Sequence, residues 1–185
     1  MGRHETPADA YAQPIAADAI RIERVLPGPR ERVWRYLTEP DLRRRWLAGG
    51  QFDLAQGGAV ELEFHNNALT ENDEPPPAEY AAHGGPSTLT GKVLACEPPA
   101  MLAFTWGEEP ASSHVRFDLA EEGDKVRLTV THSRVLKPGM ATSVSAGWHT
   151  HLDLLVAALE DRKHEGFWRS FARIQPFYAA RAARN

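Results

Sequence analysis

The chain has one cysteine, no long apolar run and no excess of basic residues, and each absence excludes a class of protein. Cys96 alone can form neither an intrachain disulfide nor a cysteine metal cluster, which fits a reducing compartment. No segment approaches the roughly 20 apolar residues of a membrane span, and the N-terminus lacks an apolar stretch of signal-peptide length. A net charge of -4 gives no general attraction to nucleic acid or to an anionic membrane. We therefore expect a cytoplasmic protein that binds neither nucleic acid nor a membrane.

The length of the chain predicts one domain. Its 185 residues, 42% of them hydrophobic, can bury a sizeable core and still leave room for a cavity. Residues 1–18 are rich in Ala, Pro and Asp and show no helical or strand period, so we expect a flexible N-terminal arm. The domain is then predicted over residues 19–163, with a helical extension over 164–185.

A long amphipathic helix is predicted over residues 142–160. Apolar residues recur there at steps of three and four, which places them on one helix face. No comparable pattern occurs between residues 50 and 140, so this face must pack against a sheet. The residues of the stripe are Val144, Trp148, Leu152, Leu155 and Leu159.

The extension carries a second apolar stripe at helical spacing, formed by Phe167, Phe171, Ile174 and Tyr178. We expect Gly166 to separate it from the preceding helix and Pro176 to weaken its continuation. The stripe can pack on its own domain or on a second copy, so a homodimer stays open as an alternative.

Alternating apolar and polar residues predict a meander of antiparallel strands with one apolar face. The first strand begins at Ala19 and ends at Pro27, and two short helices follow it, the second running through Trp46. Further strands are expected at 52–54, 59–65, 87–96, 101–106, 115–119 and 126–132, the first two of these forming a hairpin.

Residues 65–86 separate two of these strands. The segment is polar and is interrupted by Pro75-Pro-Pro77 and by Gly84-Gly-Pro86, so it predicts no regular element. Long loops inside compact domains are uncommon and usually have a role of their own. We therefore expect a lid, an interface or a disordered excursion.

Several motifs occur in a fixed order along residues 19–162. They are RVLPGPRERVW at 24–34, LTEPDL at 37–42, Trp46, GKVLACEPP at 91–99, LAFTW at 102–106, VRFDL at 115–119, LTVTH at 128–132 and AGW at 146–148. The opening resembles the SRPBCC or START-like superfamily. The later motifs resemble its branch similar to the C-terminal domain of the activator of the heat-shock protein 90 ATPase.

This resemblance implies an α+β helix-grip fold. In that fold a curved antiparallel β-sheet wraps around a long C-terminal α-helix, and two short helices follow the first strand. The resemblance implies little chemistry, because the superfamily includes carriers, cyclases, hydroxylase subunits and co-chaperone domains.

We place the candidate site in the seam between the long helix and the sheet, because ligand pockets are typically apolar and aromatic with a few polar groups. Packed core is the ordinary interpretation of any apolar residue on this sheet face. A pocket requires large aromatic side chains at the rim to hold the helix away from the sheet. The candidate ligand-binding residues are Trp46, Phe64, Phe104, Trp106, Phe117, Leu128, His132, Trp148, Leu152 and Leu155.

His132 is the most informative polar candidate. It shares its register with Val126, Leu128 and Val130, so strand alternation directs the imidazole inward. Two interpretations stay open: a buried histidine satisfied by a backbone carbonyl or water, or a hydrogen-bonding or proton-transferring group aimed at a ligand.

The sequence predicts no metal site, no cofactor and no catalytic residue. His149 and His151 diverge by about 200° on a helix and cannot bind one metal as an i, i+4 pair would; Asp153 is expected to pair with His149 at the surface. Ser112, Ser113 and His114 have triad residue types without a nucleophile elbow, so a hydrolase is rejected.

The leading functional hypothesis is binding of a small hydrophobic or aromatic molecule without catalysis. A cyclase or aromatase-like enzyme that uses the same cavity is the alternative. A co-chaperone or protein-interaction domain is a third possibility, and it rests on the family resemblance alone.

Overall fold

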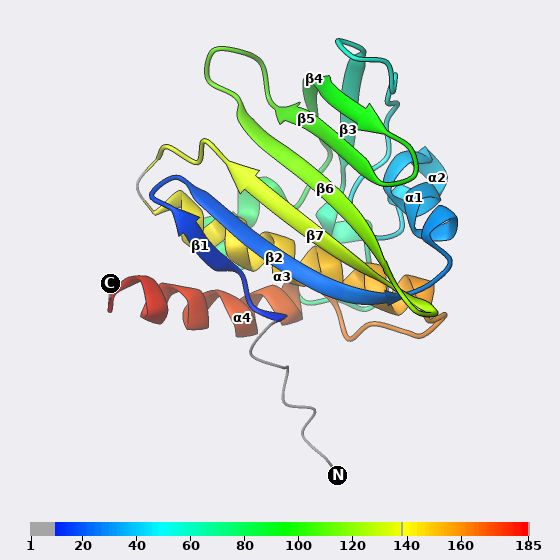
Figure 1. The fold of residues 1–185 in the computed structure, drawn as a ribbon. Coiled ribbons are helices and arrows are strands. Elements are labelled where there is room, and N and C mark those ends of the chain that lie inside the picture. The colour runs from blue at the N-terminus through cyan, green and yellow to red at the C-terminus, as the bar shows by residue number, and fades with distance from the viewer. Residues whose placement is uncertain (1–9, 138, 185) are drawn as a thin grey trace.

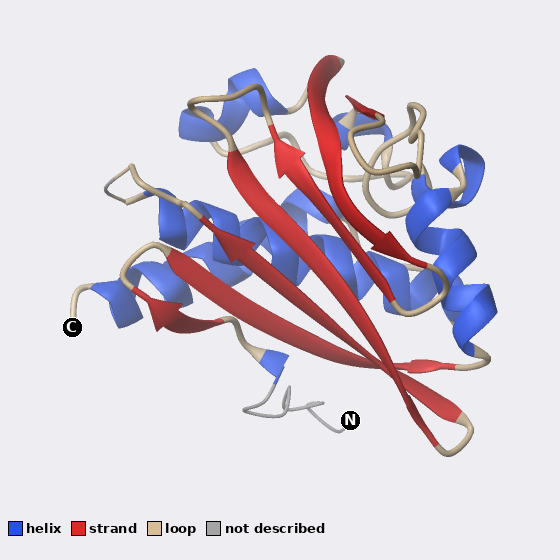
Figure 2. Ribbon diagram, turned by 45° about the horizontal axis from the view of Figure 1, so that its top comes forward, coloured by secondary structure: helices blue, strands red, loops and turns tan. Residues whose placement is uncertain are grey.

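A curved seven-stranded antiparallel sheet wraps around a long helix in this computed structural model, which describes residues 10–137 and 139–184 (Figures 1 and 2). The strands are β1 (Gln13–Ala16), β2 (Ala19–Pro27), β3 (Ala59–Phe64), β4 (Ser87–Glu97), β5 (Met101–Trp106), β6 (Ser113–Glu122) and β7 (Lys125–Ser133). Their spatial order is β1-β2-β7-β6-β5-β4-β3, so the early strand β2 pairs with the last strand β7.

Four helices accompany the sheet: α1 (Arg30–Thr38), α2 (Pro40–Arg43), α3 (Met140–Leu159) and α4 (Phe167–Ala182). Helix α3 crosses behind the sheet, α4 lies along α3, and α1 and α2 sit beyond the end of β2 (Figure 1). The α+β helix-grip fold predicted from the sequence is confirmed. None of the helices in the described part of the chain is long and apolar enough to cross a membrane.

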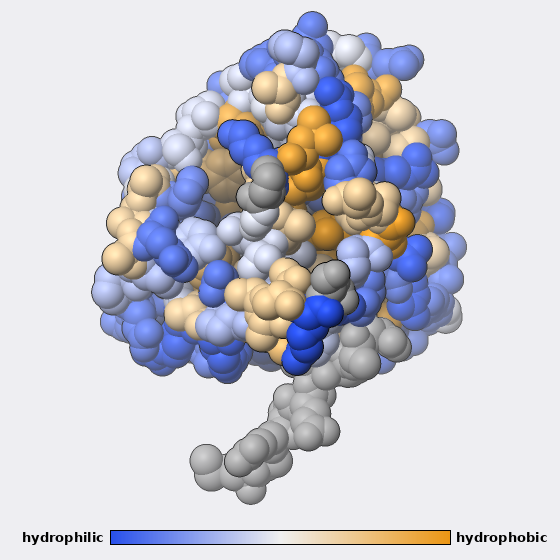
Figure 3. Space-filling model, turned by 90° about the vertical axis from the view of Figure 1, so that its left-hand side faces the viewer, coloured by the Kyte–Doolittle hydropathy of each residue, from blue (hydrophilic) through white to orange (hydrophobic). Residues whose placement is uncertain are grey.

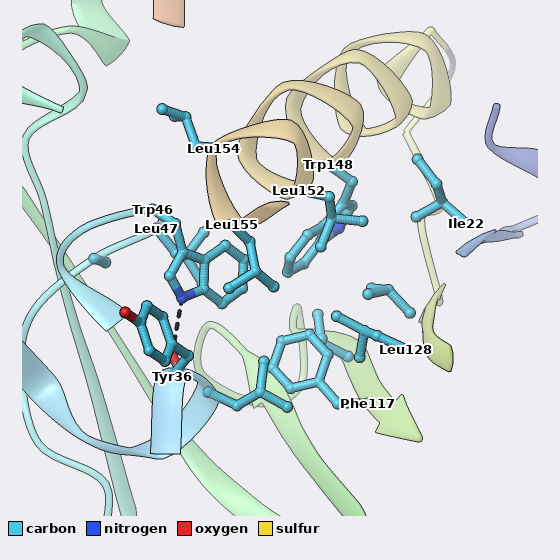
Figure 4. Close-up of a cluster of buried hydrophobic side chains, with 14 of the residues drawn as sticks. Ile22, Tyr36, Trp46, Leu47, Phe117, Leu128, Trp148, Leu152, Leu154 and Leu155 are labelled. Carbon is cyan, nitrogen blue, oxygen red and sulfur yellow. Dashed lines mark hydrogen bonds between the residues drawn. The ribbon is translucent and has the colours of Figure 1, made fainter. Parts of the chain in front are cut away.

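The apolar face of the sheet packs against one face of α3, as the two sequence periods require. Trp148, Leu152 and Leu155 of α3 point toward Phe117 and Leu128 of the sheet (Figure 4). Each aliphatic side chain buried in this way stabilises the fold by about 1.5–3 kcal/mol. The contact between helix and sheet is therefore a main source of stability.

One indole and one guanidinium group extend this core. Trp46 is fully buried beyond α2, and its Nε1 donates a hydrogen bond of 2.8 Å to the carbonyl of Tyr36 (Figure 4). Arg24 takes an inward position on β2, where its guanidinium lies 2.8 Å from the carboxylate of Asp153 on α3. Burial of these two polar groups is tolerated because the indole has a hydrogen-bond acceptor and the guanidinium has a carboxylate partner.

The N-terminal prediction is wrong for part of its range. Residues 13–16 form β1, which pairs with β2, although they show no strand period. Tertiary contacts hold this segment: the hydroxyl of Tyr178 accepts a hydrogen bond of 2.8 Å from the amide of Ala12. Residues 1–9 of the predicted arm lie outside the described residues.

Residues 52–54 do not form the expected strand. Residues 49–53 still lie alongside β3, through isolated bridges of Gly49 with Glu63 and of Phe52 with Val60 and through a backbone hydrogen bond of 2.9 Å from Asp53 to Ala59. The continuous partner of β3 is β4, so the regular hairpin consists of these two strands joined by the loop of residues 65–86. The hairpin predicted around Gly57 is therefore present only as an irregular pairing, and the regular ladder of β3 is the one with β4.

Two further helix boundaries differ from the prediction. Helix α2 ends at Arg43, before Trp46, and α4 continues past Pro176 to Ala182. Proline removes one helical hydrogen bond. In α4 the turn beyond Pro176 is held from outside, because the hydroxyl of Tyr178 also lies 3.0 Å from Nδ1 of His149 on α3.

Candidate functional site

A cavity of about 620 Å³ opens between the N-terminal half of α3 and the sheet. The loop of residues 65–86 and the start of α4 complete its wall. Figure 3 looks onto this end of the molecule, where hydrophobic side chains gather around a hollow. The apolar lining consists of Leu47, Phe64, Leu89, Trp106, Met140, Val144, Trp148, Phe167, Trp168 and Phe171.

Four of the ten residues predicted from the sequence line this cavity: Phe64, Trp106, His132 and Trp148. Trp106 is central, with its ring centroid 5.5 Å from that of Phe64 and 5.7 Å from that of Trp148. These large rings lie between helix and sheet, where smaller side chains would let the two surfaces close.

The other six do not line the cavity. Their exposed surface is 1% or less, so each is part of the packed core. Strand and helix periods assign a residue to the inner face but not to a position along the seam, and the seam is closed in its other half. The six residues are Trp46, Phe104, Phe117, Leu128, Leu152 and Leu155.

His132 points inward as predicted, and protein groups satisfy both of its ring nitrogens. The indole Nε1 of Trp148 donates to Nδ1 at 3.0 Å, and Nε2 lies 2.7 Å from Oγ of Ser113. Burial lowers the pKa of His132 to about 4, with a smaller contribution from His114. The neutral ring therefore carries its proton on Nε2 and donates it to Ser113.

This arrangement differs from a nucleophile–base pair. In a catalytic triad the base accepts the proton of the serine at Nε2, while a carboxylate accepts the proton on Nδ1. Here the Nδ1 of His132 accepts from an indole, so Nε2 is already protonated and cannot activate Ser113. The rejection of a hydrolase from the sequence agrees with this geometry.

His151 lines the cavity and was not among the predicted site residues. Its Nδ1 lies 2.8 Å from the carbonyl oxygen of Trp46, and its ring centroid is 4.7 Å from that of Phe167. Burial lowers its pKa to about 4, so the ring is neutral near pH 7. The sequence offered one signal that was not used: His151 is three residues after Trp148 and four before Leu155, a spacing that places it on the same helix face as the apolar stripe.

His149 lies away from this cavity and is also buried. Its Nε2 is 3.5 Å from the carboxylate of Asp153, one helical turn onward. The predicted pair forms, but the prediction that it lies at the surface is wrong for the histidine, which is 3% exposed because α4 covers it. Among the described residues no group of three or more His, Cys, Asp or Glu side chains could hold a metal ion.

The loop of residues 65–86 forms part of the cavity wall and contains two short 3-10 helices, η2 (Asn66–Ala68) and η3 (Ala78–His83). Tyr80 connects it to both neighbouring helices: its hydroxyl lies 3.1 Å from Oγ of Ser143 on α3, and its ring contacts Phe171 of α4 edge-on. Periodicity cannot identify such a residue.

Gly147 is another wall residue that was not among the predicted site residues, although it belongs to the AGW motif. It lies within α3, and a Cβ atom placed on it would meet no atom within 4 Å. A glycine inside a helix costs roughly 0.5–1 kcal/mol relative to alanine. The chain therefore has a residue that lowers helix stability at the position where a larger side chain would project into the cavity.

Several proteins of known structure are similar to this chain. A solved structure of the protein encoded by gene BPP1335 from Bordetella parapertussis is 41% identical and has a TM-score of 0.76, with 92% of this chain and 90% of that chain covered. CalU16 from Micromonospora echinospora is 26% identical with a TM-score of 0.62, covering 88% of this chain and 86% of that one.

At lower identity only the fold is shared. A conserved protein of unknown function, EF2215 from Enterococcus faecalis, is 18% identical with a TM-score of 0.65 over 91% of this chain and 88% of that one. A comparison with curated proteins finds no match.

The family model described as "Activator of Hsp90 ATPase homolog 1-like protein" matches residues 27–160, which is more than half of the chain. This range contains α1, α2, β3 to β7 and all of α3, and it begins at the last residue of β2. The match confirms the resemblance to the SRPBCC or START-like superfamily and to this branch of it. The chain belongs to the Activator of Hsp90 ATPase homolog 1-like protein family.

Proposed function

We propose that this protein binds a small hydrophobic or aromatic molecule in the cavity between α3 and the sheet. The observation that supports this most directly is the cavity itself, whose volume of about 620 Å³ accommodates a molecule of two or three fused rings. Small-molecule sites typically have volumes of about 300–1,000 Å³ and a mostly apolar lining with few polar groups.

Hydrophobic burial would supply most of the affinity. A ligand that buries about 300 Å² of apolar surface gains roughly 7 kcal/mol at 25 cal/mol per Å². Ordering the ligand and the side chains around it reduces that gain, so an affinity in the micromolar range or weaker is expected. Trp106 and Trp148 provide the flat surfaces on which an aromatic ligand would stack.

A cyclase-like enzyme using this cavity has less support. Acid–base catalysis at neutral pH needs two titratable groups whose environments separate their pKa values. Here the pKa values of His132 and His151 are both lowered to about 4 by burial, and both nitrogens of His132 already have partners. Binding without chemistry therefore stays our leading proposal.

Filling the cavity from Gly147 tests the proposal. A leucine there would occupy the open space beside Trp148 and also raise helix propensity by about 0.8–1 kcal/mol. We expect Gly147→Leu to weaken binding of 2-methoxynaphthalene at least tenfold by calorimetry, with a melting temperature equal to or above that of the wild type.

The matched control is Ala141→Leu, which adds the same side chain to an exposed position of the same helix outside the cavity. It should leave binding unchanged. Equal binding by the wild type and Gly147→Leu would contradict the proposed site, and no binding of naphthalene-sized probes by the wild type would contradict the proposed function.

A further inference from the structure

Away from the exposed rim of His83, Ser87 and Thr88, most acceptor atoms of the cavity wall are engaged by other protein groups. The hydroxyl of Ser143 pairs with that of Tyr80, and the indole nitrogen of Trp168 donates to Oδ1 of Asn67 at 2.7 Å. The two nitrogens of His132 are satisfied by Ser113 and Trp148. These groups have little capacity left for a ligand.

His151 is different, because one of its nitrogens is free and is not sealed from the cavity, unlike the unpaired Oδ1 of Asn66. A carbonyl oxygen can only accept, so the 2.8 Å contact with Trp46 requires the proton to be on Nδ1. In the neutral ring Nε2 then holds a lone pair. No hydrogen bond reaches this atom from the described residues, and it is not among the sealed, unpaired side-chain atoms found there.

The position of His151 directs that lone pair to the cavity. The residue is 93% buried, since 7% of its surface stays exposed, and it lines the cavity next to the ring of Phe167. A ligand that covers this atom without donating to it leaves a buried acceptor unpaired, which is unfavourable. A ligand that donates a hydrogen bond here avoids this cost, whereas an ether or a hydrocarbon does not.

Charge at the cavity restricts the kind of donor. Lys137 is the formally charged residue of the wall, and the described lining contains no carboxylate that could receive a cationic ligand. An ammonium group is therefore disfavoured by like charge. A carboxylate has no proton to donate near pH 7. A hydroxyl group is neutral and has a proton to donate, so it fits this site, and a phenol donates more strongly than an alcohol.

We propose that the ligand is a hydroxylated aromatic molecule whose hydroxyl donates a hydrogen bond to Nε2 of His151. This inference rests on the proposed function, since it assigns the ligand class and the orienting residue of the same cavity. His151 then determines specificity, while the aromatic rings supply affinity. His132, the sequence-based candidate for the orienting role, holds Trp148 and Ser113 in place instead.

Two probes of nearly equal shape test the proposed hydrogen bond to His151: 2-naphthol, whose hydroxyl can donate, and 2-methoxynaphthalene, which has no hydrogen-bond donor. We expect the wild type to bind 2-naphthol about threefold to tenfold more tightly, the effect of one net hydrogen bond of about 0.7–1.4 kcal/mol. His151→Asn keeps an amide donor near the Nδ1 position for the Trp46 carbonyl but removes the Nε2 acceptor. This variant should bind both probes equally, with its 2-methoxynaphthalene affinity within about twofold of wild type.

The control is His65→Asn, which changes an exposed histidine outside the cavity and should keep the preference for 2-naphthol. A direct readout is the ¹⁵N resonance of Nε2 of His151, which should move on addition of 2-naphthol and stay in place with the ether. If neither probe binds the wild type, the proposed function fails. If both bind equally, or if the preference survives in His151→Asn, this inference is overturned while the cavity proposal stands.

Discussion

The Ser113–His132–Trp148 chain shows how individual residues determine what this cavity can do. Each member is buried, and the indole N–H fixes the tautomer of the imidazole, which then donates to the serine. A buried polar chain of this kind is favourable only while every member has a partner. It rigidifies one wall of the cavity without presenting a base to a ligand.

Removing the serine hydroxyl should expose this dependence. We expect Ser113→Ala to lower the free energy of unfolding by about 1–3 kcal/mol, because the N–H of His132 would be left buried without an acceptor. Urea denaturation at pH 7 measures the change.

The neighbouring variant Ser112→Ala is the control for Ser113→Ala. Its hydroxyl bonds to Glu109, which is exposed, so water can replace the lost partner and the cost should stay below about 1 kcal/mol. Equal effects of the two substitutions would contradict the assigned role of Ser113.

The start of α4 shows a similar dependence between elements. Helix α4 has no side-chain cap from its own N-cap residue, Gly166. Asp73 of the long loop supplies the acceptor, with one carboxylate oxygen 2.8 Å from the amide nitrogen of Trp168 and the other 3.2 Å from that of Arg169. Gly166 has φ +133°, and a Cβ atom there would collide with the carboxylate. The loop is therefore tied to the helix that it faces.

Asp73→Ala should loosen the loop and α4 together. Loss of a helix cap and of a charge near the helix N-terminus costs about 1–2 kcal/mol. We expect faster amide hydrogen exchange in residues 66–83 and in the first turn of α4, with the sheet unaffected. Glu71→Ala, an exposed change in the same loop, is the control. Faster exchange confined to the loop would contradict the proposed coupling.

These elements also show what the sequence could and could not predict. The period-two pattern of β7 and the helical stripe of Trp148 and Leu152 predicted which faces meet, because burial repeats with the geometry of each element. Asp73 capping a helix nearly a hundred residues away, and β1 pairing without a strand pattern, depend on contacts between distant segments. The same limit explains why four predicted site residues line the cavity and six do not.

At the scale of the whole molecule, three histidines among residues 10–137 and 139–184 are buried in the neutral form. His132, His149 and His151 each have a pKa lowered to about 4, in every case chiefly by burial. Among charged neighbours, His114 adds to the effect on His132, while Arg24 and Arg173 lower and Asp153 raises the pKa of His149. The histidines lie on β7 and α3, so the cost of protonating them falls on the contact between sheet and helix.

The stability of the protein should therefore fall as the pH drops from about 6.5 to 4. In this window an unfolded histidine, with its ordinary pKa of about 6.5, binds a proton that the folded state resists. Each buried histidine can remove roughly 3 kcal/mol by pH 4, and three together approach the whole stability of a typical domain. The melting temperature, measured from pH 7.5 to 4.5, should fall steeply below pH 6.5. In His151→Asn the number of protons taken up on unfolding, obtained from the pH dependence of stability, should be smaller by about one. A melting temperature that stays constant down to pH 5 would contradict neutral burial of these three side chains.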